Sequence, residues 1–263
     1  SHEGTAPRSD DKLGWFSSRG PTWIDFAAKP DLVAPGVGTE SLSDPNSTLY
    51  SMYADYLLDG TRETPYRPYL ALTGTSMAAP VVAGTVALML EANADLTPNA
   101  VRAILQYTAD AREGASFLAQ GAGLLNALGA VRMATFFEAP TNSLPAPVDL
   151  IEDETIEWSR HIIWGNNRLD GGIPLPGSNA WALGVTWGAS ATGTGQPIVW
   201  GAKTDDTLGS RAPGGDKSAK TKGAKGKKSA KGGRRDDKIV KSTRGGDNIV
   251  WSTRGGGNIV WST

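Results

Sequence analysis

The sequence predicts an α/β layered domain in the first half of the chain, followed by a largely irregular or weakly β tail rich in tryptophan. Two observations support the layered domain. Short apolar runs bounded by Gly and Pro alternate with helical patterns up to about residue 138, and 39% of the 263 residues are apolar. The tail is defined by a third observation, because seven of the nine tryptophans follow residue 150. This apolar content suits one ordinary globular domain with appendages.

Three helices are expected within residues 1–138. The first covers residues 76 to about 93 and is apolar on nearly all sides, which is typical of a helix fully covered by its domain. The second begins at Thr97-Pro98, an N-cap residue followed by a proline in the first turn. The third covers residues 126 to about 134. The longest apolar run is too short and too interrupted to cross a bilayer, so no transmembrane segment is expected.

Composition predicts how the rest of the chain is divided. The stretch 138–148 holds three prolines, which indicates an extended linker over residues 139–148. Residues 149–208 form a region rich in Trp and Gly. Residues 209–235 consist mainly of Gly, Ala, Ser and Lys and should be a disordered basic linker.

The last segment, residues 236–263, repeats an Ile-Val-Trp-Ser-Thr unit with a period of ten. Looser copies of this unit occur upstream, at residues 161–165, 183–188 and 197–201. Each copy joins a β-branched and aromatic run to a break, so each is a candidate strand that needs neighbours to pack on. These units either bind glycans or a cell surface through exposed indoles, or simply pair as strands.

Charge is distributed unevenly. Residues 1–215 carry 13 Lys and Arg against 23 Asp and Glu, whereas residues 216–263 carry 13 against 4. The run 217–235 has nine basic residues and no acid, which would suit nucleic acid or an anionic surface. Because the run has no aromatic residue, a solvated linker is favoured and no specific nucleic-acid partner is expected. The chain has no cysteine, which excludes disulfide scaffolds, thiol catalysis and cysteine metal sites.

The strongest candidate for chemistry is Ser76. A β-prone run reaches Thr73, Gly74 permits a tight turn, and Ser76 then opens the long apolar helix. Unpaired N–H groups and the positive end of the helix dipole would stabilise an oxyanion at this point. A serine at a helix N-terminus is also a common cap, so the placement alone leaves a structural role open.

The longer string decides between these two roles. Gly74-Thr-Ser-Met-Ala-Ala-Pro80 resembles the nucleophile motif of the subtilisin-like serine proteases, or subtilases, and the strings at 16–22 and 29–36 agree with that family in the same order. The resemblance covers roughly residues 14–134. It implies an endopeptidase with a Ser-His-Asp triad on a parallel, three-layer α/β sheet, with Ser76 as nucleophile and protein or peptide substrates. It also implies a secreted or cell-surface location, although the polar start of the sequence contains no signal peptide.

The other triad members are not found. The family's Asp and His motifs are absent, His2 lies in a polar stretch, and His161 lies within a Trp repeat, where an exposed or half-buried position is expected. The expectation is therefore the C-terminal part of a subtilase catalytic domain, inactive by itself. A non-catalytic relative, or a protein whose tail anchors it to a surface, is the alternative.

Two further features concern the surroundings of Ser76. The stretch 38–69 is longer than compact subtilases need and holds five tyrosines. It is interpreted as an ordinary surface insertion, with a role in substrate choice as the alternative. No cofactor is expected; many subtilases hold structural Ca²⁺, but no Asp-rich loop here supports assigning ligands.

Overall fold

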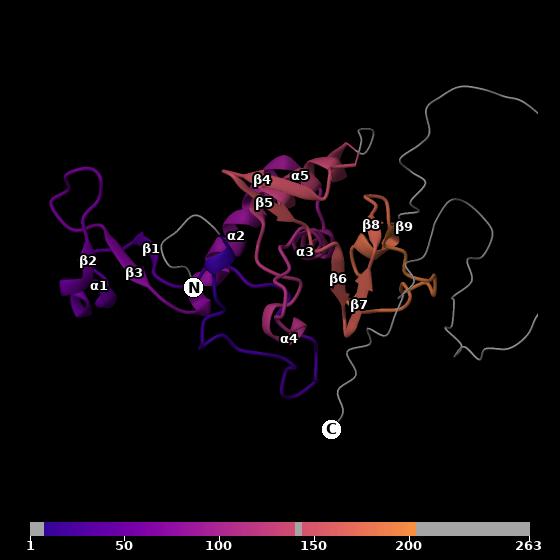
Figure 1. Ribbon diagram of the computed structural model, residues 1–263, viewed down its shortest axis with the longest axis horizontal. Coiled ribbons are helices and arrows are strands. Elements are labelled where there is room, and N and C mark those ends of the chain that lie inside the picture. Colours follow the sequence, from indigo (N-terminus) through magenta and orange to yellow (C-terminus); the bar gives the residue numbers. More distant parts are fainter. Residues whose placement is uncertain (1–7, 140–143, 204–263) are drawn as a thin grey trace, which may run out of the picture.

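The computed structural model describes residues 8–139 and 144–203 (Figure 1). His2, the basic linker and the decapeptide repeats of residues 236–263 lie outside this part. The helices are α1 (Thr48–Met52), α2 (Thr75–Ala92), α3 (Pro98–Tyr107), α4 (Phe117–Gln120) and α5 (Ala127–Glu138). The strands are β1 (Thr39–Leu42), β2 (Leu57–Leu58), β3 (Tyr69–Leu72), β4 (Val148–Ile151), β5 (Glu154–Glu157), β6 (His161–Trp164), β7 (Asn167–Asp170), β8 (Gly172–Pro174) and β9 (Gly201–Lys203). Single turns of 3₁₀ helix occur at Arg8–Asp10, Ala54–Tyr56 and Asn179–Trp181.

The three predicted helices are confirmed as α2, α3 and α5. The caps explain why α3 and α5 begin where they do. The Thr97 hydroxyl accepts the N–H of Ala100, and the Asn126 side chain accepts the N–H of Gly129. These local signals lie within a few residues of each helix start, which is why the sequence alone located them.

The sheets differ from the expectation. The fold mixes helices and strands, as predicted for an α/β chain, but the strands of the described part pair antiparallel, in the order β1-β3-β2 and as the hairpins β4-β5, β6-β7 and β8-β9. The parallel three-layer sheet is therefore not found here. The one parallel contact among the described residues is the bridge between Val33 and Leu124. The reason is local. Strand β3, which leads into α2, is paired on both edges by β1 and β2, which precede it in the chain.

Helix α2 is far less covered than predicted. Only Thr85 and Met89 of its 18 residues are buried, and Leu88 and Leu90 are exposed. An apolar helix in water needs a covering layer, and residues 8–139 and 144–203 supply that layer along one side only. By length and hydropathy α2 would also suit a membrane span, a property that core helices of soluble proteins share.

One hydrophobic core joins the two described segments. Met89 of α2, Ile104 of α3 and Met133 of α5 belong to the same buried cluster as Ile162 and Trp164 of β6. The Trp-rich segment therefore packs on the helices that precede it, and α3 and α5 are held from both sides.

The three looser repeat copies pack against one another, although only the first is a complete strand. The Trp164 and Trp187 rings lie 4.5 Å apart, and the Trp200 ring lies 5.8 Å from Trp164. The Trp164 indole donates to the Ala189 carbonyl, and the Trp187 indole donates to the Ile163 carbonyl. These three indoles face the core and each other. In the three described repeat copies the tryptophans therefore pack inside the fold and do not form an exposed aromatic surface.

The glycine after each of the first two repeat tryptophans makes this pairing possible. A Cβ atom added at Gly165 would lie 2.9 Å from the Gly188 Cα, and the reverse contact is equally short. Both glycines also have positive φ, 59° and 91°. Any larger residue at either position would separate the two units.

Candidate active site

Ser76 is exposed in the first turn of α2, directly after β3. The turn that places it is held by the preceding chain, because the Gly74 N–H donates to the Gly36 carbonyl over 2.8 Å. The Gly38 N–H donates to the Thr73 hydroxyl over 3.0 Å and fixes the end of the same strand. A strand, a tight turn and a helix N-terminus therefore follow one another in the predicted order.

The start of α2 offers free donors. The amide groups of Thr75 and Ser76 have no acceptor within the described part, whereas the Met77 N–H donates to the Gly74 carbonyl. No side chain of the described residues caps this helix. An anion forming at the Ser76 side chain would thus meet unpaired N–H groups and the positive end of the helix dipole.

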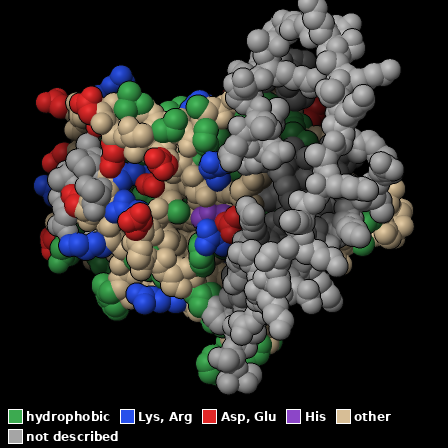
Figure 2. All heavy atoms as spheres, turned by 45° about the vertical axis from the view of Figure 1, so that its right-hand side comes forward, with side chains coloured by type: hydrophobic (Ala, Val, Ile, Leu, Met, Phe, Trp, Pro, Cys, Tyr) green, Lys and Arg blue, Asp and Glu red, His purple; other side chains and the backbone are tan. Residues whose placement is uncertain are grey.

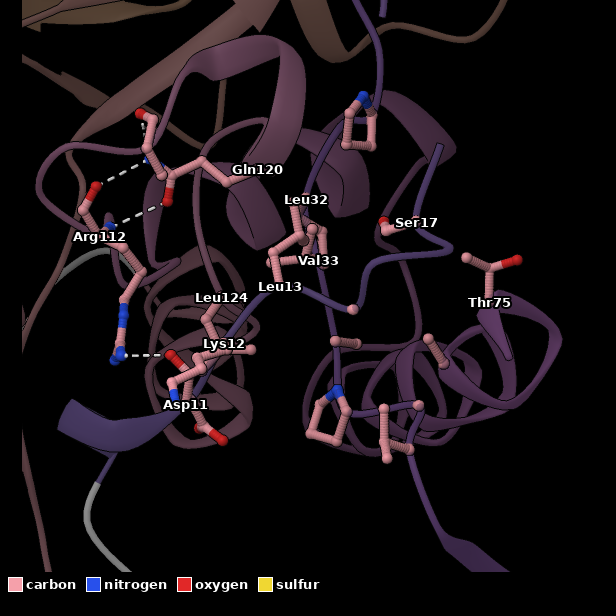
Figure 3. A pocket seen from close by; sticks show the side chains of 18 of the residues that line it. Asp11, Lys12, Leu13, Ser17, Leu32, Val33, Thr75, Arg112, Gln120 and Leu124 are labelled. Atoms are coloured by element: carbon pink, nitrogen blue, oxygen red, sulfur yellow. Dashed lines mark hydrogen bonds between the residues drawn. The ribbon is translucent and has the colours of Figure 1, made fainter. Parts of the chain in front are cut away.

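A cavity of about 940 Å³ lies beside this turn (Figure 3). The N-cap residue Gly74 and the α2 residues Thr75 and Ala78 line it, whereas Ser76 is not among its lining residues. Its other walls carry the apolar side chains of Leu13, Leu32, Val33 and Leu124 and the Arg112–Gln120 pair, which is joined by two hydrogen bonds of 2.9 Å. The cavity is mostly apolar, and it adjoins the uncovered side of α2.

A second cavity of about 760 Å³ continues along α2. It shares Ala79 and Val82 with the first and extends past Val86 and Leu90 toward α3. Both cavities border one stripe of α2, in which Val82 and Val86 are partly buried and Leu90 is exposed. They are better understood as an unfilled core than as a substrate cleft, because Ser76 lines neither of them.

The segment Lys29–Gly36 is held in place by Asp31. Its carboxylate accepts from Arg102 Nε over 2.8 Å, from Gln106 Nε2 over 3.2 Å, and from Lys29 Nζ over 2.5 Å. These contacts fix the segment that carries Gly36, and through it the Gly74 turn. The role is structural support for Ser76.

His161 is not exposed or half-buried, as the sequence suggested, but 2% exposed in β6. The prediction was wrong because this repeat copy forms a strand whose four residues are all buried. Its Nδ1 lies 2.9 Å from the Ser159 carbonyl, which can only accept, so Nδ1 carries the proton. Nε2 has no partner in the described part, and the ring packs edge-on against Phe117 of α4. His161 is therefore a buried residue whose ring is hydrogen-bonded to Ser159 and not to Ser76.

Burial lowers the pKa of His161 from 6.5 to about 4, and the nearby Arg168 charge contributes to the same shift. The unfolded chain binds a proton near pH 6.5 and the folded chain only near pH 4. We therefore expect His161 to stabilise the fold fully above pH 6.5 and this stability to fall by about 3 kcal/mol between pH 6.5 and pH 4. Urea unfolding at pH 7 and pH 4.5 measures the change.

His161→Phe is the matched control, because phenylalanine keeps the ring contact and cannot titrate. The raised pKa of Asp110, caused mainly by burial, is common to both proteins and cancels in the comparison. Equal pH dependence in the two proteins would contradict the assignment of this effect to His161.

The charged groups of the described residues can be compared with the requirements of a metal site. Within residues 8–139 and 144–203, no three His, Asp or Glu side chains gather as metal ligands would. Acidic and basic side chains alternate over the face shown in Figure 2.

The comparison with known families identifies the first half of the chain. A family model for the subtilases matches residues 5–123. This stretch belongs to the subtilase family. The subtilase segment includes the Gly74 turn, Ser76 and the Lys29–Gly36 segment, and the family consists of serine-type peptidases.

Individual relatives agree. Serine protease AprX of Bacillus subtilis (strain 168) is 42% identical over 127 residues, which are 48% of this chain and 27% of AprX. Subtilisin-like protease SBT3.2 of Arabidopsis thaliana is 38% identical over 99 residues, 37% of this chain and 11% of that protein. SBT3.9 of the same plant is 31% identical over 146 residues, 50% of this chain and 17% of that protein. The chain thus spans about a quarter of AprX and less of the plant relatives.

Sequence reasoning missed the cavities of the subtilase segment. Residues 11–18, 30–37 and 112–124 meet there, and no local signal in the sequence shows that these three stretches come together. The apolar face of α2 was visible in the sequence, but whether a partner covers that face depends on parts of the fold that the sequence pattern does not give.

Proposed function

We propose that this chain carries the nucleophile of a serine endopeptidase and that Ser76 is that nucleophile. The observation that supports this most is the placement of Ser76. It is exposed in the first turn of α2, next to unpaired amide groups, within a segment that belongs to a family of serine peptidases. A capping serine would use its side chain to accept a helix N–H, and Ser76 Oγ has no such bond in the described part.

The reaction would be acyl transfer. The Ser76 oxygen attacks the carbonyl carbon of a peptide bond while its proton passes to a base, and the N–H of Ser76 stabilises the oxyanion. The base then returns the proton to the leaving amine as the C–N bond breaks. Water attacks the ester in the second half, and Ser76 regains its proton.

The base and its carboxylate partner are proposed to come from polypeptide outside residues 8–139 and 144–203. Within that part the histidine is His161, whose ring is buried and bonded to Ser159. A serine hydroxyl without a base is a weak nucleophile, so we expect no hydrolysis above background from the described part alone.

The uncovered side of α2 supports this proposal from packing alone. An 18-residue apolar helix with two buried residues, flanked by cavities of about 940 and 760 Å³, needs more polypeptide against it. We propose that this polypeptide is the remainder of a subtilase domain. Protein or peptide substrates and a secreted or cell-surface location follow from the family and belong to the same proposal.

A hybrid protease tests the function. In this hybrid, the stretch of AprX that matches this chain is replaced by residues 5–203 of this chain. We expect the hybrid to hydrolyse a chromogenic peptide at a rate well above background, and the chain by itself to show none. A folded hybrid without hydrolysis would instead favour a non-catalytic subtilase relative.

A further inference from the structure

The chain has an extension, residues 38–68, that connects the Gly36 segment to β3. It contains β1, α1, the turn Ala54–Tyr56 and β2, and it projects from one end of the molecule (Figure 1). Neither α1 nor the following 3₁₀ turn has a buried residue. The strands β1 and β2 of the extension pair with β3, whereas its helical part is left open.

The open helical part carries an apolar stripe. Leu49 and Met52 of α1, Tyr53 at its C-terminus and Tyr56 of the following 3₁₀ turn are 47%, 67%, 39% and 71% exposed. The Tyr53 and Tyr56 rings contact each other edge-on at 6.3 Å. Tyr and Met are enriched where proteins bind other chains, and exposed apolar side chains gathered on one short segment are typical of an interaction surface.

The stripe is firmly connected to the Ser76 turn. Strand β1 pairs with β3 from Thr39↔Leu72 to Leu42↔Tyr69, and β2 pairs with the other edge of β3. The Ser47 hydroxyl accepts the Tyr50 N–H over 3.1 Å and fixes the start of α1. Since β3 ends four residues before Ser76, a chain positioned by the stripe is also positioned relative to Ser76.

The charge of the extension that carries the stripe indicates what it binds. Residues 38–68 hold five acidic and two basic side chains. One of the two, Arg67, is already paired with Asp59 over 3.4 Å. Five acidic and two basic side chains give the extension a net charge of −3, which favours apolar side chains flanked by Lys or Arg and disfavours acidic ones.

We propose that the stripe of Leu49, Met52, Tyr53 and Tyr56 is a docking site for polypeptide substrates, and that it selects segments in which aromatic or aliphatic residues are flanked by basic ones. This inference rests on the proposed function, because it assigns the occupant of the stripe from its connection to Ser76.

The test is binding of a synthetic twelve-residue peptide, with a Leu-Phe-Leu centre flanked by Lys, to the full chain. We expect shifts of backbone NMR signals in residues 49–56 and a dissociation constant at least ten times larger for the double variant Met52→Ser, Tyr56→Ser. Because both positions are exposed, the fold should tolerate the changes. Leu150→Ser on β4 is the matched control, since Leu150 is as exposed as Met52 and is expected to change nothing.

A peptide with Glu in place of Lys should bind at least ten times more weakly. The proposal is overturned if no peptide binds, if binding survives the double substitution, or if the Glu peptide binds equally well. Hydrolysis does not enter this readout, so an inactive Ser76 would leave the docking result intact. In the hybrid protease the double variant should raise KM for such substrates with little change in kcat.

Discussion

Replacement of Ser76 by alanine in the hybrid protease is expected to lower kcat about a millionfold. This magnitude is taken from subtilisin, in which loss of the nucleophile has an effect of that size. The physical reason is that the Ser76 oxygen is the proposed attacking atom, so its removal leaves only substrate binding and oxyanion stabilisation by the helix amides. Initial rates with a chromogenic peptide at saturating concentration measure the loss.

Ser41→Ala provides the matched control, because Ser41 is an exposed serine on β1, away from the α2 turn. We expect this variant to keep the activity of the hybrid. If Ser76→Ala retained more than about a hundredth of the activity, another group would have to be the nucleophile.

Replacement of Asp149 by alanine is expected to lower the free energy of unfolding by about 3–5 kcal/mol. The carboxylate is buried and accepts from Asn126 Nδ2 over 2.7 Å, from Trp158 Nε1 over 2.5 Å, and from Arg132. Alanine would leave both neutral donors unsatisfied and the guanidinium without its partner. Urea unfolding of the full chain at pH 7 measures the change.

The cluster around Asp149 also explains a tightly packed glycine. A Cβ atom at Gly129 would lie 2.6 Å from Asn126 Nδ2 and 2.7 Å from the Asp149 carboxylate, so only glycine lets the hairpin β4-β5 reach the start of α5. Asp153→Ala, at the exposed tip of the same hairpin, is the control and should change stability by less than about 0.5 kcal/mol. Equal losses in the free energy of unfolding would show that the Asp149 cluster does not stabilise the contact between α5 and the hairpin β4-β5.

The parts of the fold that the sequence predicted are those with local signals. Thr97-Pro98 and Asn126 fix the starts of α3 and α5 through side-chain caps, and the Gly74 turn fixes the start of α2. Each signal lies within four residues of the feature it determines. The position of Ser76 at the start of a helix was predictable for the same reason.

The features that the sequence did not predict depend on contacts between distant residues. Whether α2 is covered depends on what packs against Val86 and Leu90, and nothing in the helix itself gives that. The same holds for His161, which is buried because Phe117, from a different part of the fold, packs against its ring while the Ser159 carbonyl holds Nδ1. A repeat motif predicts a strand but not the face that the strand buries.

The nucleophile can be identified by labelling the hybrid protease with a fluorophosphonate and mapping the modified residue by mass spectrometry. We expect one phosphonyl adduct on the peptide that contains Ser76, and no adduct in the Ser76→Ala variant. An adduct on another serine, or an active hybrid that the probe does not modify, would contradict the assignment of Ser76 as the nucleophile.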